Sequence, residues 1–267
     1  MAYFNRPSVD GDSDEPADPS LTTTSHHVFE DDAGKSVFSI AIIENMEEEY
    51  GLYVWPCSII LAEYVWQQKA RFAGVNVVEL GAGTSLPGLV AAKLGANVTL
   101  TDDANRVEVL DNIRKVCDLN NLNCNIMGLT WGMWDISIFN LRPTIIIGAD
   151  VLYENSAFDD LFSTVAFLLQ NSPGSVFITT YHNRSGHHLI EFLMVKWGLK
   201  CEKLVDGFAF LPSQKASKLS GNIQLAEIVL NCGSVKVVES KDNAIKGTFF
   251  SNWRQLRIRA KIKASHW

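Results

Sequence analysis

From Val75 onward the chain alternates between short apolar runs and longer amphipathic segments. Apolar runs of four to eight residues predict strands, and apolar residues spaced three or four apart predict helices. The expected strands are 75–80, 97–102, 125–130, 143–149, 175–181, 200–205 and 223–230. The expected helices are 57–72, 86–94, 104–119, 156–170 and 186–197.

Alternating strands and helices are typical of an α/β fold with a parallel sheet. The continuous apolar run over 144–147 fits a strand that is buried on both faces. Because no helix is expected between the last two strands, they should pair as a hairpin. We therefore expect a doubly wound, Rossmann-like sheet of seven strands, mostly parallel with a terminal antiparallel hairpin. A looser alternation over 28–43 predicts a short hairpin before it.

The charge of the chain is unevenly distributed. The 267 residues carry a net charge of −7 and are 47% hydrophobic, enough for one substantial core. Residues 1–36 hold eight acids against two bases, whereas residues 232–267 hold eight bases against two acids. We expect a disordered acidic tail over 1–27, one α/β domain over 28–231, and a basic extension over 232–267.

Composition also argues against several classes of protein. No apolar run approaches the ~20 residues that span a bilayer, and the first 25 residues do not resemble a secretory leader. The five cysteines form no Cys-x-x-Cys pair, which fits reduced thiols in the cytoplasm and nucleus. No metal site is expected, because adjacent histidines point in different directions. The mildly acidic body makes direct nucleic-acid binding unfavourable.

The most informative motif is Glu79-Leu80-Gly81-Ala82-Gly83, with Asp102 at the end of the next strand. In a doubly wound sheet, both acids and the glycine turn lie where nucleotide-like ligands bind. A dinucleotide fingerprint needs a third glycine where this chain has Leu86. A carboxylate before the glycines repels a pyrophosphate and favours a cation. The motif therefore predicts S-adenosylmethionine, with Asp102 accepting the ribose hydroxyls.

A second candidate group follows the fourth expected strand. Asp150 would project into the same crevice, where Tyr153 adds a ring face for a cationic side chain. Glu154, beside them, and Tyr181, at the end of the next strand, are added from their expected positions. Two tryptophans at segment ends, Trp55 and Trp131, could cover an adenine or a methionine group.

Five motifs in order resemble the "family 16" seven-strand, S-adenosylmethionine-dependent protein methyltransferases. They are Tyr53-Val54-Trp55-Pro56, Glu79 to Gly83, Leu100-Thr101-Asp102, Leu129-Thr130-Trp131-Gly132 and Ala149 to Tyr153. The resemblance covers about residues 28–231. It implies cofactor contacts from Trp55, Glu79, Gly81, Ala82, Gly83, Asp102, Trp131 and Ala149. It also implies that Asp150 and Tyr153 hold the incoming amine.

The resemblance implies a protein substrate with a basic side chain. It favours an arginine of histone H3 as the methylated side chain, whereas most members of the family modify lysine. Deprotonating lysine at neutral pH costs about 4–5 kcal/mol, so Asp150 would orient the nitrogen and water would remove the proton. Two alternatives stay open: a small-molecule or nucleic-acid methyltransferase, and a non-catalytic module that binds the cofactor. The oligomeric state is not indicated.

Overall fold

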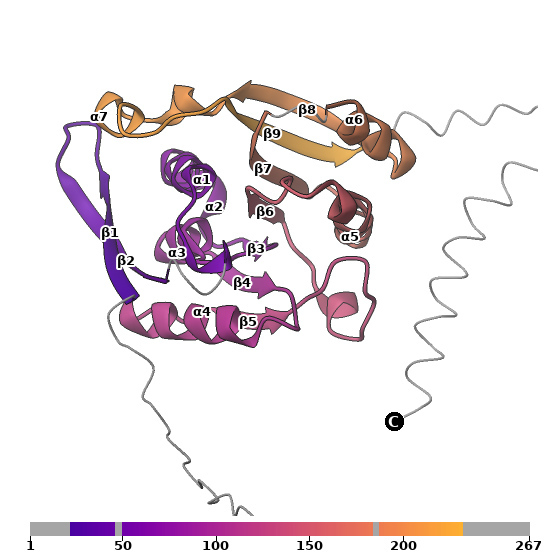
Figure 1. Ribbon diagram of the computed structural model, residues 1–267, viewed down its shortest axis with the longest axis horizontal. Coiled ribbons are helices and arrows are strands. Elements are labelled where there is room, and N and C mark those ends of the chain that lie inside the picture. Colours follow the sequence, from indigo (N-terminus) through magenta and orange to yellow (C-terminus); the bar gives the residue numbers. More distant parts are fainter. Residues whose placement is uncertain (1–21, 46–49, 184–186, 232–267) are drawn as a thin grey trace, which may run out of the picture.

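The structure is a computed structural model that describes residues 22–45, 50–183 and 187–231 (Figure 1). The basic extension and residues 1–21 of the acidic tail lie outside the described residues, as do the predictions made for them. In the part of the chain that is described, no helix has the length and apolar character needed to cross a bilayer.

A seven-stranded sheet forms the centre of the molecule. Its strand order is β5 (Asn125–Gly128), β4 (Asn97–Asp102), β3 (Asn76–Glu79), β6 (Ile145–Ala149), β7 (Val176–His182), β9 (Ile223–Leu230) and β8 (Leu199–Asp206). The first five strands are parallel, and β9 runs antiparallel to both of its neighbours. This arrangement confirms the expected mostly parallel sheet with a terminal antiparallel hairpin.

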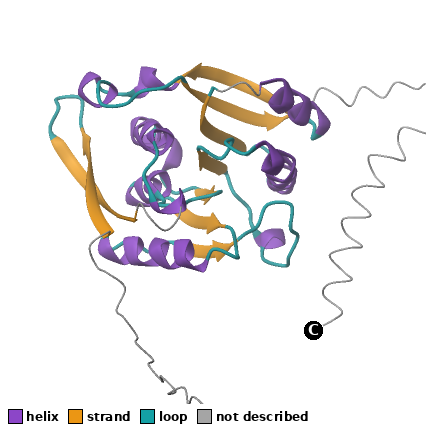
Figure 2. Ribbon diagram, viewed as in Figure 1, coloured by secondary structure: helices purple, strands orange, loops and turns teal. Residues whose placement is uncertain are grey.

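Helices cover both faces of the sheet (Figures 1 and 2). One side holds α1 (Pro56–Gln67), α2 (Lys69–Phe72), α3 (Leu86–Lys93) and α4 (Val107–Leu119), and the other holds α5 (Phe158–Asn171) and α6 (His187–Lys196). The short helices are η2 (Tyr50–Leu52), η3 (Ile138–Asn140), η4 (Asn155–Ala157), η5 (Gly207–Phe210) and α7 (Ser213–Ala216). The predicted helix over 57–72 is divided in two at Gln68.

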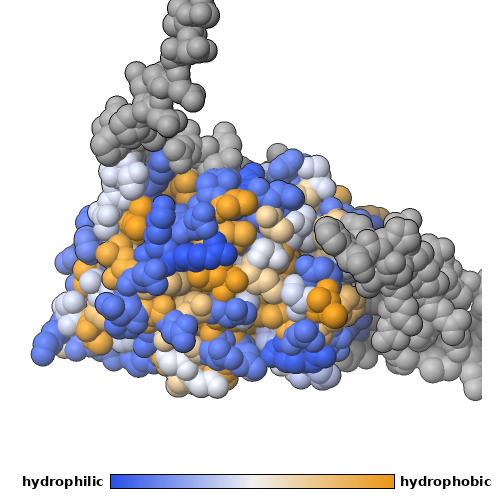
Figure 3. Space-filling model, turned by 90° about the horizontal axis from the view of Figure 1, so that it is seen from below, coloured by the Kyte–Doolittle hydropathy of each residue, from blue (hydrophilic) through white to orange (hydrophobic). Residues whose placement is uncertain are grey.

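Two apolar cores follow from this layering. The first lies under α1, α3 and α4 and includes Tyr64, Phe72 and Leu89; the second lies under α5 and includes Phe162 and Phe177. All five of these side chains are fully buried. Burying one large apolar side chain contributes about 1.5–3 kcal/mol, so the two cores fix the helices against the sheet. The face seen in Figure 3 carries mainly hydrophilic residues with apolar ones between them.

A separate two-stranded sheet packs outside the α1, α3 and α4 layer. Its strands are β1 (Thr22–Glu30) and β2 (Ser36–Asn45), so the hairpin predicted over 28–43 is longer at both ends. The boundary placed after residue 27 is wrong, because 22–27 belong to β1. Three β-branched threonines begin this strand and pair with the end of β2. Ile40 and Ile42 are buried in the first core, which secures β2.

The chain reverses its strand order between β3 and β6. Beyond the carboxyl ends of these strands, the connections to α3 and to α5 leave the sheet in different directions, and a crevice opens between them. The loops after β3, β4, β5 and β6 therefore meet at one edge of the sheet, where the candidate site lies.

Candidate active site

A cavity of about 700 Å³ opens at the carboxyl ends of β3, β4 and β6. Its lining residues come mainly from five connecting segments, which precede α1 and follow β3, β4, β5 and β6, and from the first turn of α5. Nine residues predicted for the site line it: Trp55, Gly81, Gly83, Asp102, Trp131, Ala149, Asp150, Tyr153 and Glu154. The structure therefore brings together most of the side chains that the motifs indicate, from segments up to 99 positions apart between Trp55 and Glu154.

Both motif glycines have left-handed backbones, with φ of 58° at Gly81 and 52° at Gly83. A Cβ on Gly81 would lie 3.0 Å from the Trp131 ring, and one on Gly83 would lie 3.0 Å from the carbonyl oxygen of Gly51. Because glycine has no side chain, the Trp131 indole can approach Gly81 and the loop of Gly51 can approach Gly83. Contacts within the protein therefore require glycine at both positions, in addition to any requirement from a ligand.

Two residues predicted to contact the cofactor do not line the cavity. Glu79 is 1% exposed and points under α3, where its Oε2 accepts the N–H of Gly88 at 3.1 Å. Burial holds the pKa of Glu79 well above its usual range. Ala82 is also buried, and its N–H donates to the carbonyl of Thr101. Both residues are buried and support the turn through these hydrogen bonds.

Asp102 lies at the end of β4 and faces the glycine turn. Its carboxylate accepts the N–H groups of Gly83 and Asp103, each at 2.8 Å. Burial raises the pKa of Asp102, against the effect of these two bonds and of the nearby Arg106 charge. The two bonds fix the carboxylate at the cavity wall. Its remaining lone pairs can accept hydrogen bonds from the hydroxyl groups of a ligand.

The next residue, Asp103, also lines the cavity and was missed by the sequence argument. Burial opposes its ionisation, but hydrogen bonds from Thr130 and Asn105 and the charge of Arg106 together lower the pKa of Asp103. The Thr130 hydroxyl donates to it at 2.6 Å, which joins the loops after β4 and β5. The sequence could have indicated Asp103, because Asp102 and Asp103 are adjacent acids at the end of one strand.

Both predicted tryptophans line the wall of the cavity. Trp55 immediately precedes α1 and packs edge-on against Tyr53, with ring centroids 5.2 Å apart. Its loop is held by the buried Glu44 of β2, whose Oε2 accepts the N–H of Val54 at 2.9 Å. Trp131 lies against Gly81. Both indoles are half-buried and present surface for an aromatic or apolar part of a ligand.

Asp150 has an unusual conformation directly after β6. Its φ is 53°, in the left-handed region that few non-glycine residues adopt, and its N–H donates to the Thr180 carbonyl at 2.8 Å. Its Oδ1 is buried without a hydrogen-bond partner. A buried carboxylate oxygen of this kind is costly unless a ligand donates to it. Such strain and such an unmet acceptor concentrate at functional sites.

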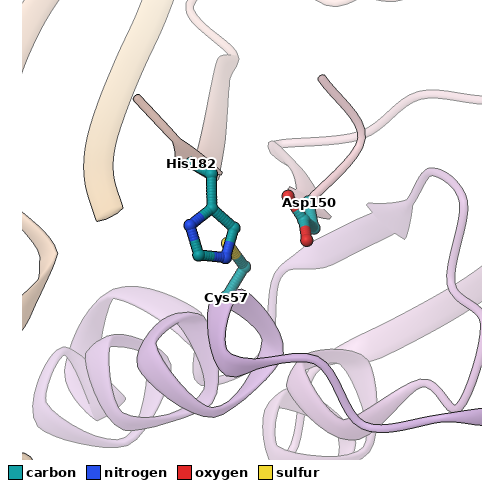
Figure 4. Close-up of side chains that lie close together, drawn as sticks. All are labelled: Cys57, Asp150 and His182. Atoms are coloured by element: carbon teal, nitrogen blue, oxygen red, sulfur yellow. The ribbon is translucent and has the colours of Figure 1, made fainter. Parts of the chain in front are cut away.

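Tyr153 and Glu154 continue the same loop. The Tyr153 side chain is 53% exposed at the cavity mouth, and partial burial raises the pKa of its hydroxyl. Glu154 accepts the Ser156 hydroxyl at 2.6 Å. Tyr181, by contrast, is 6% exposed and packs in the second core. Its neighbour His182 is the β7 residue that faces Asp150 (Figure 4).

Several further residues complete the wall, and the sequence analysis assigned none of them a role. Gly51 belongs to the η2 loop, Arg106 precedes α4, and Asp160 lies in the first turn of α5. Burial, and then the Asp159 charge, raise the pKa of Asp160. The last lining residues are Leu129, Thr130, Val151 and Ala157. Gly51, Arg106, Ala157 and Asp160 lie outside the quoted motifs and reach the cavity through the tertiary fold, so residue spacing could not reveal them.

The lining has a strong excess of negative charge. Arg106 is the single basic residue among the lining residues, which include the acids Asp102, Asp103, Asp150, Glu154 and Asp160. This wall favours cationic ligands and repels phosphates. The glycine turn, the Asp102 carboxylate and the two indoles fit S-adenosylmethionine, which carries a sulfonium, an ammonium group, a ribose and an adenine. The class of protein that this fold and cavity define is an S-adenosylmethionine-dependent methyltransferase.

Comparison with known proteins gives the same class and adds the family. The family described as "Lysine methyltransferase" matches residues 35–196, which is more than half of the chain. The chain belongs to this family. Four short motifs, Val54 to Cys57, Ser85 to Gly88, Gly128 to Gly132 and Lys196 to Cys201, predict a particular similarity to methyltransferase-like protein 23. The relatives confirm that prediction.

The histone-arginine methyltransferase METTL23 of Xenopus laevis is 44% identical over 164 residues, covering 61% of this chain and 70% of that protein. The protein N-lysine methyltransferase METTL21A of Mus musculus is 35% identical over 129 residues, covering 45% of this chain and 56% of that protein. Among solved structures, the CcbJ methyltransferase of Streptomyces caelestis aligns with a TM-score of 0.51. It is 14% identical and covers 66% of this chain and 93% of its own, which shows the shared fold alone.

Proposed function

We propose that this protein methylates an arginine side chain of histone H3 or of another basic protein. The observation that carries the proposal is Asp150, whose buried Oδ1 has no hydrogen-bond partner in a wall that also holds Glu154. Two carboxylates suit the several N–H donors of a guanidinium better than a single amine. The name of the METTL23 relatives supports the same acceptor.

We assign the cofactor residues from the family resemblance, and the lining of the cavity supports the assignment. Asp102 holds the ribose through the lone pairs that Gly83 and Asp103 leave open. Trp131 covers the adenine, while Trp55 and Ala149 close the wall near the transferred group. Bound S-adenosylmethionine supplies a methyl group on a sulfonium, which a nitrogen lone pair can take. Glu79 and Ala82 support this site from behind, through the packing of α3 and the turn.

The acceptor residues work by orientation. Asp150 accepts a hydrogen bond from the substrate nitrogen and directs its lone pair, and Tyr153 offers a ring face to the cation. Glu154 accepts a second N–H. A carboxylate favours the charged acceptor, so the proton passes to water. Positioning two reactants in this way accounts for a large share of the acceleration in a transfer reaction.

The acidic wall also bears on partners and location. It suits a substrate rich in lysine and arginine, and it disfavours direct contact with the phosphates of a nucleic acid. We propose that the protein works in the cytoplasm and the nucleus, where basic nuclear proteins and reduced thiols are found together. Fractionation of cells that express a tagged full-length chain would test this location.

The test is methylation of core histones with radiolabelled S-adenosylmethionine, followed by acid hydrolysis and amino-acid analysis. We expect label in methylarginine of the H3 band, and its loss with Asp150→Asn. Asp111→Asn is the matched control, since Asp111 is exposed and pairs with Arg114 in the next turn of α4. Label in methyllysine would instead favour the alternative of a protein-lysine methyltransferase, which the family description supports.

A non-catalytic module that binds the cofactor remains the alternative from another class. It predicts normal binding of S-adenosylmethionine by calorimetry with no label in histones or in a whole-cell extract. Loss of cofactor binding as well would contradict both readings of the cavity.

A further inference from the structure

A thiol, a carboxylate and an imidazole converge beside the cavity (Figure 4). Cys57 lies in the first turn of α1, Asp150 follows β6, and His182 ends β7. One donor atom from each residue lies within 4.8 Å of the other two. Sulfur, oxygen and nitrogen donors together suit Zn²⁺, whereas Mg²⁺ and Ca²⁺ prefer oxygen ligands alone.

Thr180 of β7 ties the three elements together. Its hydroxyl donates to the carbonyl oxygen of Cys57 at 2.8 Å, and its own carbonyl accepts the N–H of Asp150 at 2.8 Å. Thr180 and His182 are two positions apart in one strand, so their side chains share a face of the sheet. Thr180 is fully buried. The convergence is therefore built into the fold rather than arising from mobile surface side chains.

Each of the three donors is also held individually. Cys57 is 0% exposed, beneath the other two residues. The His182 ring packs on Gly221, where an added Cβ would lie 2.7 Å from its Cε1. Asp150 is fixed in its left-handed conformation, and its Oδ1 lacks a hydrogen-bond partner. A cation at this point would satisfy that buried oxygen.

We propose that Cys57, Asp150 and His182 form a Zn²⁺ site whose occupation withdraws Asp150 from the acceptor side chain and inhibits methyl transfer. Tetrahedral zinc with these ligands spaces its donors about 3.3–3.6 Å apart, so a small contraction of the cluster closes the site. On binding, Cys57 loses its thiol proton to solvent and His182 binds as the neutral imidazole. Three protein ligands leave a fourth position for water.

The site was not expected from the sequence, because its ligands lie far apart along the chain and show no ligand spacing. Binding of zinc is independent of what the enzyme methylates. Inhibition by zinc rests on the proposed function, in which Asp150 holds the acceptor. The two parts therefore need separate measurements.

The first measurement is calorimetric titration of the purified full chain with Zn²⁺ alone, without cofactor or substrate. We expect one tight site that Cys57→Ser and His182→Gln each weaken at least about tenfold, since even outer-shell changes cost zinc sites that much. His188→Gln and Cys124→Ser are controls that should leave the affinity unchanged. Co²⁺ should give a sulfur-to-cobalt charge-transfer band that disappears in Cys57→Ser. Zinc affinity that follows Cys124 instead, or that ignores His182, would overturn the site.

The second measurement is the rate of histone methylation with and without added Zn²⁺. We expect zinc to inhibit the wild type, a chelator to restore the rate, and His182→Gln to keep its zinc-free rate while resisting inhibition. Equal inhibition of His182→Gln and wild type would overturn the regulatory role. A chain without any methylation activity would instead contradict the proposed function, and the titration would still decide the metal site.

Discussion

The carboxylate of Glu79 lies against the backbone of Gly88 and accepts its N–H at 3.1 Å. An added Cβ at Gly88 would overlap both Glu79 Oε2 and the Leu100 side chain. Gly88 thus allows the helix to pack closely on the strand, which is the role of the third glycine in a dinucleotide fingerprint. It stands two positions later than that pattern requires. This pair joins β3 to α3, and so supports the glycine turn at the cavity.

Gly88→Ala should destabilise the protein by about 1–3 kcal/mol, because the new methyl group has no room between Glu79 and Leu100. In an exposed helix the same change would stabilise the protein by up to ~1 kcal/mol. The sign of the change in unfolding free energy therefore shows whether Gly88 is closely packed. Urea denaturation measures it. Lys93→Ala, at an exposed site of the same helix, should change stability by less than about 0.5 kcal/mol.

Glu79 should make the protein less stable as pH rises. Burial raises its folded pKa above the unfolded value, so the folded state binds more protons in the range between the two. Each pKa unit is worth ~1.4 kcal/mol. Glu79→Gln removes this dependence, and its melting temperature should gain on the wild type as pH rises from 5 to 8, measured by thermal denaturation at each pH. A constant gap between the two proteins would contradict a raised pKa for the buried Glu79 carboxyl.

Glu227, in contrast to Glu79, should make the protein more stable as pH rises from the acid range. Burial disfavours its charge, but hydrogen bonds from Arg71 and Tyr64 lower the pKa of Glu227 to about 2. Its contribution is therefore present above the unfolded pKa and is lost as pH falls toward 2. Glu227→Gln should cost roughly 1–3 kcal/mol at pH 7 and much less near pH 3, measured by urea denaturation. An equal loss at both pH values would exclude the ionised carboxylate as the cause.

Asp102→Asn should weaken binding of S-adenosylmethionine roughly 10- to 100-fold, the cost of losing a charged hydrogen-bond acceptor. Because burial raises the pKa of Asp102, wild-type affinity should fall on acidification at a higher pH than an exposed aspartate would cause. Calorimetry from pH 4.5 to 8 measures both effects. The variant should lack this acid dependence, and a variant that keeps it would place the titration elsewhere.

Asp150→Asn should lower the methylation rate by at least about 100-fold while cofactor affinity stays near that of the wild type. Glu154→Gln should have a smaller effect, under about tenfold, since its carboxylate is near solvent and already accepts the Ser156 hydroxyl. Steady-state kinetics on histone H3 and calorimetry with the cofactor check the pair. A larger loss from Glu154→Gln than from Asp150→Asn would reverse the roles assigned to the two acids.

The amino-acid sequence by itself determined the strands, the helices and the edge of the sheet at which the site lies. Apolar periodicity is local, and strand-end acids in a parallel sheet must gather at one edge, so Asp102 and Asp150 could be placed without coordinates. Conversely, the β1 strand was partly missed, because its threonines are polar and become a strand only by pairing with β2.

Only the tertiary structure decided which way each side chain points and which distant residues meet. Glu79 belongs to the most recognisable motif, yet it turns under α3 and away from the cavity. His182 is unremarkable in the sequence, yet β7 places it opposite Cys57 and Asp150. Arg106, just before α4, and Asp160, in the first turn of α5, line the cavity because of the tertiary fold, which no local pattern encodes. The physical reason is that packing and hydrogen bonding across the whole chain, rather than neighbouring residues, fix these orientations.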